Sequence, residues 1–404
     1  MRLHRNLVEA VVQGLELIFS KDTYADKAIE RLLKSNKRWG SRDRGFIAET
    51  CYEIVRYKRL YTEIAGVGQR MTNRQDGFRI FAVWAVLRGI SLPDWPEFKG
   101  TPERRIKGRF DALQKERVYR ESIPDWLDQI GLEGLGETLW EAELSALNQV
   151  APVVIRTNTL KTNPKLLQAT LTEEGFETDP IKGQPEALVL RKRGNLFKTK
   201  SFSEGWFEVQ DASSQRVAPL LDVGAGMRVL DCCAGAGGKT LHLAALMENK
   251  GRILATDIYP GKLNELKKRA RRAGAFCIEA RAVKGPSDLK RQKGKFDRIL
   301  IDAPCSGLGV LRRNPDTKWK LRPDQIETLV QTQREILSGY SRLLSPGGKL
   351  VYATCSILPQ ENRQQVDWFL DTEAGAAFKL VKDEKIFASA SGFDGFYLAL
   401  LERK

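Results

Sequence analysis

The stretch Val229–Thr240, which reads VLDCCAGAGGKT, decides the predicted fold. An apolar run ends at Asp231, small residues follow, and a helical pattern begins near Lys239. Small residues after a first strand let a ligand approach the backbone, and the next helix N-terminus offers free N–H donors. The following predicted strand ends at Asp257, 20 residues after Gly237, where a carboxylate hydrogen-bonds a ribose hydroxyl. The stretch therefore predicts a site for a nucleotide-type cofactor with a ribose, such as S-adenosylmethionine.

Two other interpretations of this glycine-rich loop compete with a cofactor site. A phosphate-binding P-loop requires the pattern GxxxxGK[ST]. Counting back from Gly238, Lys239 and Thr240 places Cys233 where the first glycine should stand, so the spacing excludes a P-loop. A strand-to-helix turn without a ligand remains an alternative while the loop is considered alone.

Outward from the loop, strands and helices alternate from about Leu221 to the C-terminus. This pattern is typical of an α/β protein with a doubly wound, Rossmann-like parallel sheet. The predicted strands are Arg228–Asp231, Arg252–Asp257, Phe276–Ala280, Asp297–Asp302 and Lys349–Thr354, with two short ones near Phe378–Val381 and Phe396–Leu401. The predicted helices between them are Lys239–Met247, Lys262–Ala273 and Asp324–Leu344.

Two of the six cysteines follow the ends of predicted strands. Cys305 comes after Asp302 and Cys355 after Thr354, and the carboxyl ends of such strands form the ligand crevice of a doubly wound sheet. A thiolate is a strong nucleophile toward an electron-poor ring carbon. For a single cysteine a buried apolar role is the alternative, but two at matching strand ends favour catalysis. Cys51 and Cys277, which lie on an apolar helical stripe and inside a strand, are predicted to be core residues.

Upstream of the sheet the chain divides into two further regions. Residues 1–145 are predicted to be a basic, all-α domain, because apolar residues recur there at helical spacing. Residues 146–220 are predicted to be a small α/β subdomain, and 221–404 the catalytic domain. For the turn-rich basic stretch Lys99–Arg109, a solvated loop is favoured over phosphate contacts.

Composition narrows the class of protein. The 404 residues carry 66 Lys and Arg against 51 Asp and Glu, a net charge of +15, which favours a polyanionic partner such as nucleic acid over a merely soluble surface. No apolar stretch is long enough to cross a membrane, and no signal-peptide core follows Met1, so we expect a cytoplasmic protein. The cysteines show no CxxC pair and there are only two histidines, which argues against a metal site; His242 is expected to be structural.

Several motifs together resemble a known family. They are Ala212–Gln215 after Val209–Asp211, the loop before Lys239, Asp302–Gly307 with Arg312–Asp316, and Tyr352–Ser356 followed by Glu361 and Asn362. Over residues 150–404 the chain resembles the Fmu/Sun-type bacterial members of the Nop/Sun family of RNA (cytosine-C5) methyltransferases. A weaker match around Asp43–Ile47 and Val55–Tyr57 is similar to the helical RNA-binding domain of antitermination factor NusB.

The resemblance implies roles for individual residues. The family's cofactor loop falls on Cys233, Ala234, Gly235, Ala236, Gly237, Gly238 and Lys239. It further implies that Asp257 binds the ribose, Lys262 lies near the methionine carboxylate, and Asp302 lies beside both cofactor and target base. Cys355 matches the attacking cysteine and Cys305 the cysteine that assists product release. The resemblance also implies that the partner is RNA, with ribosomal RNA the favoured kind. It implies a monomer that holds no metal.

The sequence also departs from the family. Gly235-Ala236-Gly237-Gly238 stands where the family carries Ala-Pro-Gly-Gly, and Val283 falls where an aspartate usually contacts the adenine amino group. Two functions therefore compete with RNA methylation: a DNA cytosine-C5 methyltransferase with Cys305 as nucleophile, and a non-catalytic RNA-binding assembly factor that merely retains the fold.

Overall fold

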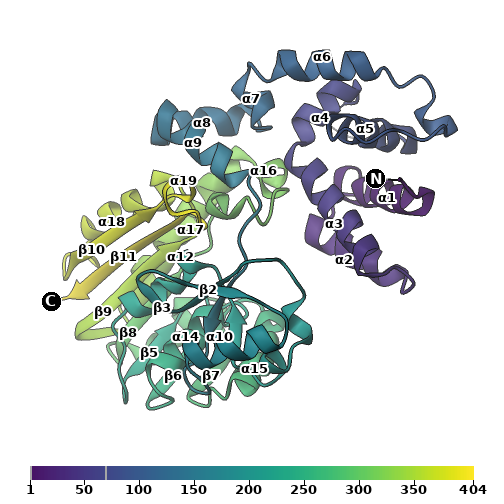
Figure 1. Ribbon diagram of the computed structural model, residues 1–404. Coiled ribbons are helices and arrows are strands. Elements are labelled where there is room, and N and C mark those ends of the chain that lie inside the picture. Colours follow the sequence, from purple (N-terminus) through teal and green to yellow (C-terminus); the bar gives the residue numbers. More distant parts are fainter. Residues whose placement is uncertain (1, 69–70) are drawn as a thin grey trace. The chain divides into compact units, whose positions relative to one another are not determined.

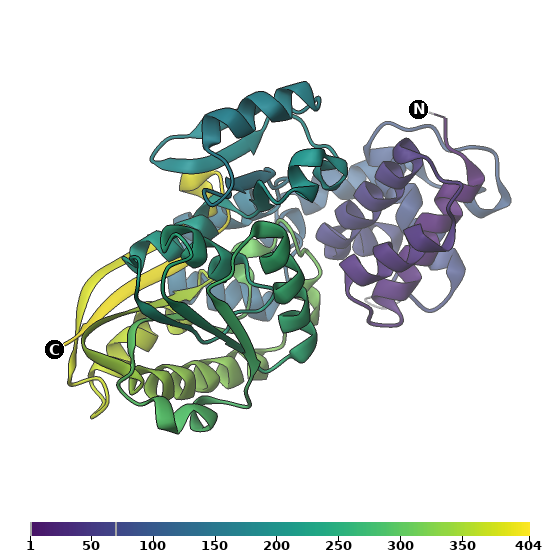
Figure 2. The ribbon, with the colours of Figure 1, turned by 90° about the horizontal axis from the view of Figure 1, so that it is seen from below.

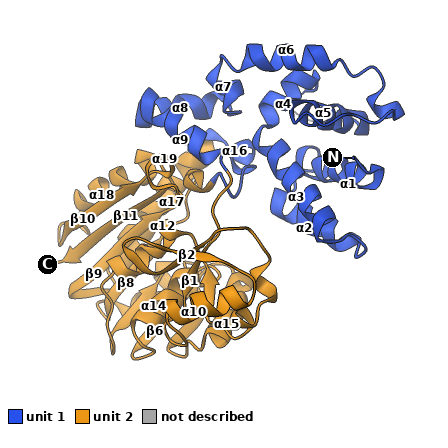
Figure 3. Cartoon of the chain, viewed as in Figure 1, with its two compact units in different colours: residues 1–149, 311–323 blue, residues 150–310, 324–404 orange. Residues whose placement is uncertain are grey.

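The computed structural model describes residues 2–68 and 71–404 (Figure 1). Its contacts divide the chain into two compact units (Figure 3). Unit 1 comprises residues 1–149 and 311–323, and unit 2 comprises residues 150–310 and 324–404. The segment 311–323, which the sequence places inside the range 221–404, thus makes its contacts within the helical unit.

Unit 1 is helical. Its helices are α1 (Arg5–Phe19), α2 (Ala25–Ser35), α3 (Ser41–Arg56), α4 (Lys58–Ala65), α5 (Arg74–Leu87), α6 (Glu103–Leu113), α7 (Arg117–Arg120), α8 (Asp125–Leu135), α9 (Glu137–Leu147) and α16 (Thr317–Lys320), with a short 3₁₀ turn at Pro96–Phe98. The apolar stripe of α1 is fully buried at Val8, Val11 and Leu15, because residues spaced three or four apart share one face of a helix. Helix α5 begins with a capping box, in which the Asn73 side chain accepts from the amide of Asp76, so its first donors are satisfied.

The inserted segment 311–323 is held in unit 1 by specific hydrogen bonds. Trp319 Nε1 donates to the Val55 carbonyl at 2.7 Å, and the Ala25 amide donates to Asp316 Oδ2 at 2.8 Å. The Lys318 side chain is buried and reaches the Glu121 carbonyl at 3.3 Å. Burial lowers the pKa of this ammonium group to about 7.

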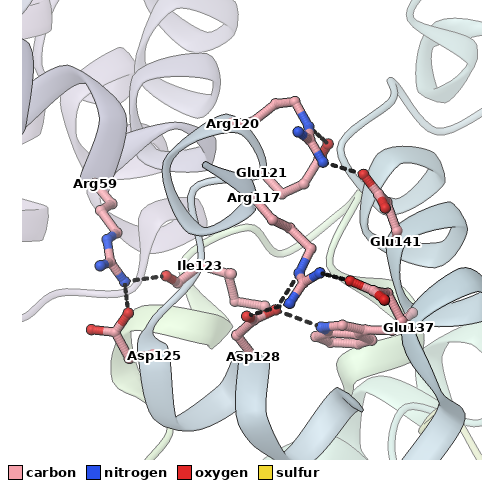
Figure 4. A network of polar contacts seen from close by, with 10 residues as sticks. Arg59, Arg117, Arg120, Glu121, Ile123, Asp125, Asp128, Glu137 and Glu141 are labelled. Carbon is pink, nitrogen blue, oxygen red and sulfur yellow. Dashed lines mark hydrogen bonds and ion pairs between the residues drawn. The ribbon is translucent and has the colours of Figure 1, made fainter. Parts of the chain in front are cut away.

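An ion-pair network fastens the last helices of unit 1 (Figure 4). Arg117 of α7 makes two hydrogen bonds of 3.0 Å to the Asp128 carboxylate of α8. The same carboxylate accepts from Trp140 Nε1 of α9 at 2.8 Å. Since one buried carboxylate receives donors from two neighbouring helices, α7, α8 and α9 are fixed relative to one another.

Unit 2 contains a small antiparallel sheet with the order β2-β3-β1-β4. Its strands are β1 (Val154–Thr157), β2 (Thr178–Ile181), β3 (Gln184–Leu190) and β4 (Phe207–Val209). Helix α10 (Pro164–Glu173) packs on β2 and β3 (Figure 2). The helix starts where the Asn163 side chain accepts from the Leu166 amide and Pro164 takes the first helical position, as helix N-termini prefer.

The larger sheet of unit 2 has seven strands in the order β10-β11-β9-β8-β5-β6-β7. They are β5 (Arg228–Asp231), β6 (Arg252–Asp257), β7 (Ile278–Ala282), β8 (Phe296–Asp302), β9 (Leu344–Thr354), β10 (Phe378–Ile386) and β11 (Phe396–Arg403). The strands β9, β8, β5, β6 and β7 are parallel, whereas β10 and β11 are antiparallel. The predicted Rossmann-like α/β sheet is confirmed, with a mixed instead of a wholly parallel arrangement.

Helices cover both faces of this sheet. The remaining helices are α11 (Lys200–Ser203), which contacts β4 of the small sheet, and α12 (Ala212–Gln215), α13 (Val217–Leu220), α14 (Gly238–Leu246), α15 (Pro260–Ala273), α17 (Pro323–Ser341), α18 (Arg363–Leu370) and α19 (Ala388–Ser391), with 3₁₀ turns at Leu196–Lys198, Pro286–Gln292, Leu308–Val310 and Pro359–Glu361. Alternate strand residues face opposite sides: Val229 packs with α14 and α15, and Leu230 with α17 and α18. The core therefore consists of two apolar layers separated by the sheet.

Several strand and helix boundaries differ from those predicted. β7 begins two residues later than predicted, so Cys277 lies just before the strand and not inside it. Cys277 is half-buried, and the preceding residue, Phe276, is 82% exposed at the turn after α15. α17 ends at Ser341, and β9 already begins at Leu344. β10 continues to Ile386 because it pairs along its length with β11. Cys51 is fully buried in the helical core, as predicted.

Within residues 2–68 and 71–404, no helix combines the length and apolarity that crossing a membrane requires. The same residues contain no cluster of three or more His, Cys, Asp or Glu side chains arranged to hold a metal ion.

Candidate active site

The loop between β5 and α14 has a backbone that only glycines adopt readily. Gly235 and Gly237 have φ angles of 54° and 89°, in the left-handed region that disfavours residues with a Cβ. A Cβ on Gly237 would lie 2.6 Å from Leu266 Cγ of α15, so this glycine also allows close packing of loop and helix. At Gly235 and Gly238 a Cβ would meet no atom within 4 Å, because both backbones face open space.

That open space is a cavity of about 550 Å³. It is lined by nine of the ten predicted cofactor residues: Cys233, Ala234, Gly235, Ala236, Gly238, Lys239, Asp257, Lys262 and Asp302. The tenth, Gly237, is not in the wall and acts through the turn that it permits. Residues from the ends of β5, β6 and β8 and from helices α14 and α15 therefore meet at one cavity at the carboxyl edge of the sheet.

Asp257 ends β6 and braces the glycine loop. Its Oδ2 accepts from the Gly235 amide at 2.9 Å, and its Oδ1 accepts from the Tyr259 amide at 2.8 Å. Each carboxylate oxygen has two lone pairs, so both retain acceptor capacity toward a ligand hydroxyl.

Lys239 and Asp302 form an ion pair on the other side of the cavity. Lys239 Nζ of α14 lies 2.6 Å from Asp302 Oδ2, at the end of β8. Burial disfavours the charged lysine, but Asp302 and Cys355 outweigh burial and raise the pKa of Lys239. The ammonium group is therefore held in its charged form between the cavity and the second cysteine motif.

The two catalytic candidates Cys305 and Cys355 lie together. Their Sγ atoms are 3.4 Å apart, because β8 and β9 are parallel neighbours with Asp302 opposite Ala353. The Gly309 amide also donates to the Cys355 carbonyl at 2.9 Å, which closes one loop onto the other. The hydrogen bond to Cys355 and burial hold the pKa of Cys305 well above that of a free thiol.

Val283 does not lie in the cavity wall, although the chain count places it at the adenine-contacting position. Its side chain is 5% exposed and packs in the apolar layer with Leu289 and Tyr340. The neighbouring wall is formed by Lys284, Gly285 and Pro286. An adenine in this cavity would therefore meet apolar surface and backbone at that point, with no carboxylate from position 283.

Several wall residues have no distinctive sequence signal. Asp231, Tyr259, Pro286, Ile336 and Tyr340 line the cavity, and only the strand-end position of Asp231 marks it in the sequence. Burial raises the pKa of Asp231 to about 7. His242, predicted to be structural, lies outside the cavity wall, with its Nε2 3.0 Å from Glu186 Oε2.

Comparison with known families matches two ranges of the chain. Residues 218–402 match the family model described as 16S rRNA methyltransferase RsmB/F. Residues 123–196 match the ferredoxin-like domain of RsmF/B-like methyltransferases, a range that includes the strands β1, β2 and β3.

Similar proteins cover the whole chain. The ribosomal RNA small subunit methyltransferase B of Vibrio cholerae is 38% identical over 399 residues, 90% of each chain, and that of Salmonella typhi is 36% identical over 100% of both chains. The crystal structure of PH0851 superposes with a TM-score of 0.84 at 27% identity over 100% of both chains. A methyltransferase homologue from Pyrococcus horikoshii gives a TM-score of 0.64 at 26% identity, over 72% of this chain and 98% of its own. The chain therefore belongs to the RsmB/F family of 16S rRNA methyltransferases.

Proposed function

We propose that this protein transfers a methyl group from S-adenosylmethionine to C5 of a cytosine in small-subunit ribosomal RNA, through a covalent bond between Cys355 and C6. The observation that carries the proposal is the 3.4 Å separation of the Cys305 and Cys355 Sγ atoms. Asp302, at the end of β8, lines the cofactor-sized cavity and pairs with Lys239, which also interacts with Cys355.

The residues of the cavity fit S-adenosylmethionine. Gly235 and Gly238 leave open backbone where a Cβ would intrude, and Asp257 offers carboxylate acceptors to ribose hydroxyls. Lys262, whose ammonium group lies 4.7 Å from the centre of the Tyr259 ring, is placed to attract the methionine carboxylate. When bound, the cofactor supplies an electrophilic methyl group on a sulfonium.

The protein's own groups account for the remaining chemistry. The Cys355 thiolate forms a bond to C6, and the electron pair displaced from the ring makes C5 nucleophilic. During this addition N3 takes up a proton from water, which it returns on elimination, and the Asp302 carboxylate accepts the hydrogen bond from N3–H. After methylation, C5 loses its proton to water, the C6–S bond breaks, and the departing Cys355 sulfur receives a proton from Cys305.

Basic surface supports an RNA substrate. On α15 the inner residues Arg269 and Arg272 pair with Glu208, whereas Lys267 and Arg271 are exposed. Exposed cations of this kind neutralise phosphates and make binding sensitive to salt. We propose that the helical residues 1–145 and the subdomain 146–220 contribute RNA affinity in the same way. Relatives named for ribosomal RNA favour that substrate, and it fits the expected cytoplasmic location.

The test uses in-vitro-transcribed 16S rRNA and S-adenosylmethionine carrying a labelled methyl group. We expect label at C5 of a cytosine, located by bisulfite sequencing. With RNA containing 5-fluorocytidine we expect a covalent adduct that survives denaturing electrophoresis and maps to Cys355. An adduct on Cys305 would instead assign the nucleophile as in DNA cytosine-C5 methyltransferases. RNA binding without cofactor binding or label transfer would identify a non-catalytic assembly factor.

A further inference from the structure

A buried carboxylate ties the two cysteine turns together. Glu361 is fully buried in the 3₁₀ turn that follows β9. Its Oε2 accepts from the hydroxyl groups of Ser306 and Ser356, the residues that directly follow the two cysteines. Its Oε1 accepts from the Ser306 amide at 2.8 Å and from Gln333 Nε2 at 3.1 Å.

The hydrogen-bond pattern around this group suits a carboxylate. The Ser306 amide and Gln333 Nε2 can only donate, and each serine hydroxyl has a proton to donate, so a carboxylate can accept from all four. The same Gln333 amide nitrogen also donates to the Pro304 carbonyl at 2.9 Å. Gln333 lies on helix α17. This helix therefore holds the Cys305 turn in two ways, through the Glu361 carboxylate and through its direct hydrogen bond to the Pro304 carbonyl.

Asn362, the residue after Glu361, makes similar hydrogen bonds to the turn that carries Cys355. Asn362 Nδ2 donates to the Ser356 carbonyl at 2.9 Å, and its Oδ1 accepts from Thr354 Oγ1. The Tyr352 hydroxyl donates to the Glu361 carbonyl at 2.7 Å. Glu361 is thus held from both sides, and it cannot move without displacing the turn of each cysteine.

We infer that Glu361 is a positioning residue that holds the two cysteines at catalytic separation and determines which of them is the nucleophile. The inference rests on the proposed function, since it concerns the chemistry of the same two thiols. The charges around the pair are unequal. Lys239, a cation, interacts with Cys355, whereas Glu361 makes two hydrogen bonds to Ser306, beside Cys305, and one to Ser356, beside Cys355.

The unequal charges favour different protonation states. The pKa of Cys305 is raised by its hydrogen bond to Cys355, by burial and by the charge of Cys355, in that order. The charge of Glu361 raises it further. The Tyr352 hydroxyl group also interacts electrostatically with Cys305. A thiol at Cys305 does not compete for C6, and it retains the proton that the departing Cys355 sulfur needs. The buried charge therefore separates the nucleophile from the acid.

The experiment compares Glu361→Gln, which removes the charge and keeps the size, with Glu361→Asp, which keeps the charge. Each thiol is alkylated with iodoacetamide over a pH series, and the modified cysteine is identified by peptide mass spectrometry. Asp222→Asn is the matched control, because Asp222 pairs with Lys349 at 2.7 Å at the opposite edge of the sheet. Its φ of 53° is one that asparagine tolerates.

In wild type we expect Cys305 to be alkylated only at high pH, because its pKa is raised. In Glu361→Gln we expect alkylation of Cys305 to move to lower pH, because the negative charge that contributes to this rise is gone. We expect kcat for 16S rRNA to fall about 10- to 100-fold with an unchanged KM for S-adenosylmethionine. Glu361→Asp should retain the wild-type pH profile and regain part of the lost kcat.

An unchanged Cys305 pH profile in a folded Glu361→Gln variant would overturn the inference, because a purely structural role changes stability alone. If that variant does not fold, Ser356→Ala provides the second arm. It removes one donor and no charge, so it should lower kcat while leaving the Cys305 profile unchanged. A shifted profile in Ser356→Ala would contradict the role of the charge. Alkylation requires neither RNA nor cofactor, so failure of the proposed function would be recognised separately.

Discussion

The Sγ atoms of Cys305 and Cys355 lie 3.4 Å apart although 50 residues separate them in the chain. Each cysteine follows the carboxyl end of one of two parallel strands that are hydrogen-bonded neighbours, β8 and β9. Two thiols in contact share one environment, but Glu361 and Lys239 make that environment unequal for the two sulfurs. This asymmetry leads to opposite expected effects for the two alanine variants.

Cys355→Ala should lower the rate of methyl transfer at least about 1,000-fold, because it removes the sulfur that activates C5. Cys305→Ala should instead accumulate a covalent protein–RNA complex, since the departing sulfur loses its proton donor. Denaturing gels of each variant with 16S rRNA and cofactor distinguish the two. A Cys355→Ala variant within tenfold of wild-type turnover would assign the nucleophile to Cys305.

Gly309→Ala should separate the cysteine turns. A Cβ at this position would lie 2.1 Å from the Gly395 carbonyl oxygen and 2.8 Å from that of Cys355. We expect a loss of about 1–3 kcal/mol in the free energy of unfolding and a lower kcat. Gly108→Ala is the control, because a Cβ there meets no atom within 4 Å and alanine is favoured inside a helix. Equal stability of the two variants in urea unfolding would contradict the tight packing at Gly309.

Val283→Asp should weaken the protein without tightening cofactor binding. The Val283 side chain is buried in the apolar layer, so a carboxylate there would be desolvated without a partner. We expect a lower melting temperature at neutral pH and partial recovery at acidic pH, where the carboxyl group is neutral. Val283→Ala controls for lost packing. Tighter binding of S-adenosylmethionine to Val283→Asp by calorimetry would show that position 283 reaches the adenine.

The free energy of unfolding should decrease as pH falls, because His242 is buried in its neutral form. Burial, followed by the nearby Arg156, lowers the pKa of His242 to about 4, below the value of about 6.5 in an unfolded chain. The unfolded state therefore binds the proton first as pH falls from about 6.5 to about 4. The contribution is fully present above this window and decreases by up to about 3 kcal/mol across it. His242→Gln should flatten this dependence in urea unfolding measured over the window, and an identical slope would refute the assignment.

The inserted segment 311–323 should depend on the helical unit for its structure. Trp319 is packed against the helical core and hydrogen-bonded to Val55, so Trp319→Ala should cost about 2–4 kcal/mol. Phe276→Ala, at an 82% exposed ring, is the control and should be nearly neutral. A fragment that begins at residue 150 lacks the partners Ala25, Val55 and Glu121 of this segment and should be cleaved within 311–323 by limited proteolysis. Resistance of that segment in the fragment would show that it folds without unit 1.

The sequence by itself determined the class of fold and placed the candidate site residues at the strand ends. The bounds of β5 and β6 and the strand-end positions of Asp257, Cys305 and Cys355 follow from local patterns. Apolar runs bounded by glycine, proline and acidic residues are local signals of strands. A parallel sheet then brings the carboxyl ends of its strands to one edge, so the site could be assembled from the motifs alone.

Only the tertiary structure decided which side chains face the site. Val283 and Glu361 have no local signal that distinguishes the apolar layer from the cavity, or a surface carboxylate from a buried one. The segment 311–323 belongs to the helical unit because Trp319 and Lys318 find their partners there, more than 150 residues away in the chain. Burial, charge and hydrogen bonding between distant residues depend on how the elements pack, and periodicity along the chain carries no record of that packing.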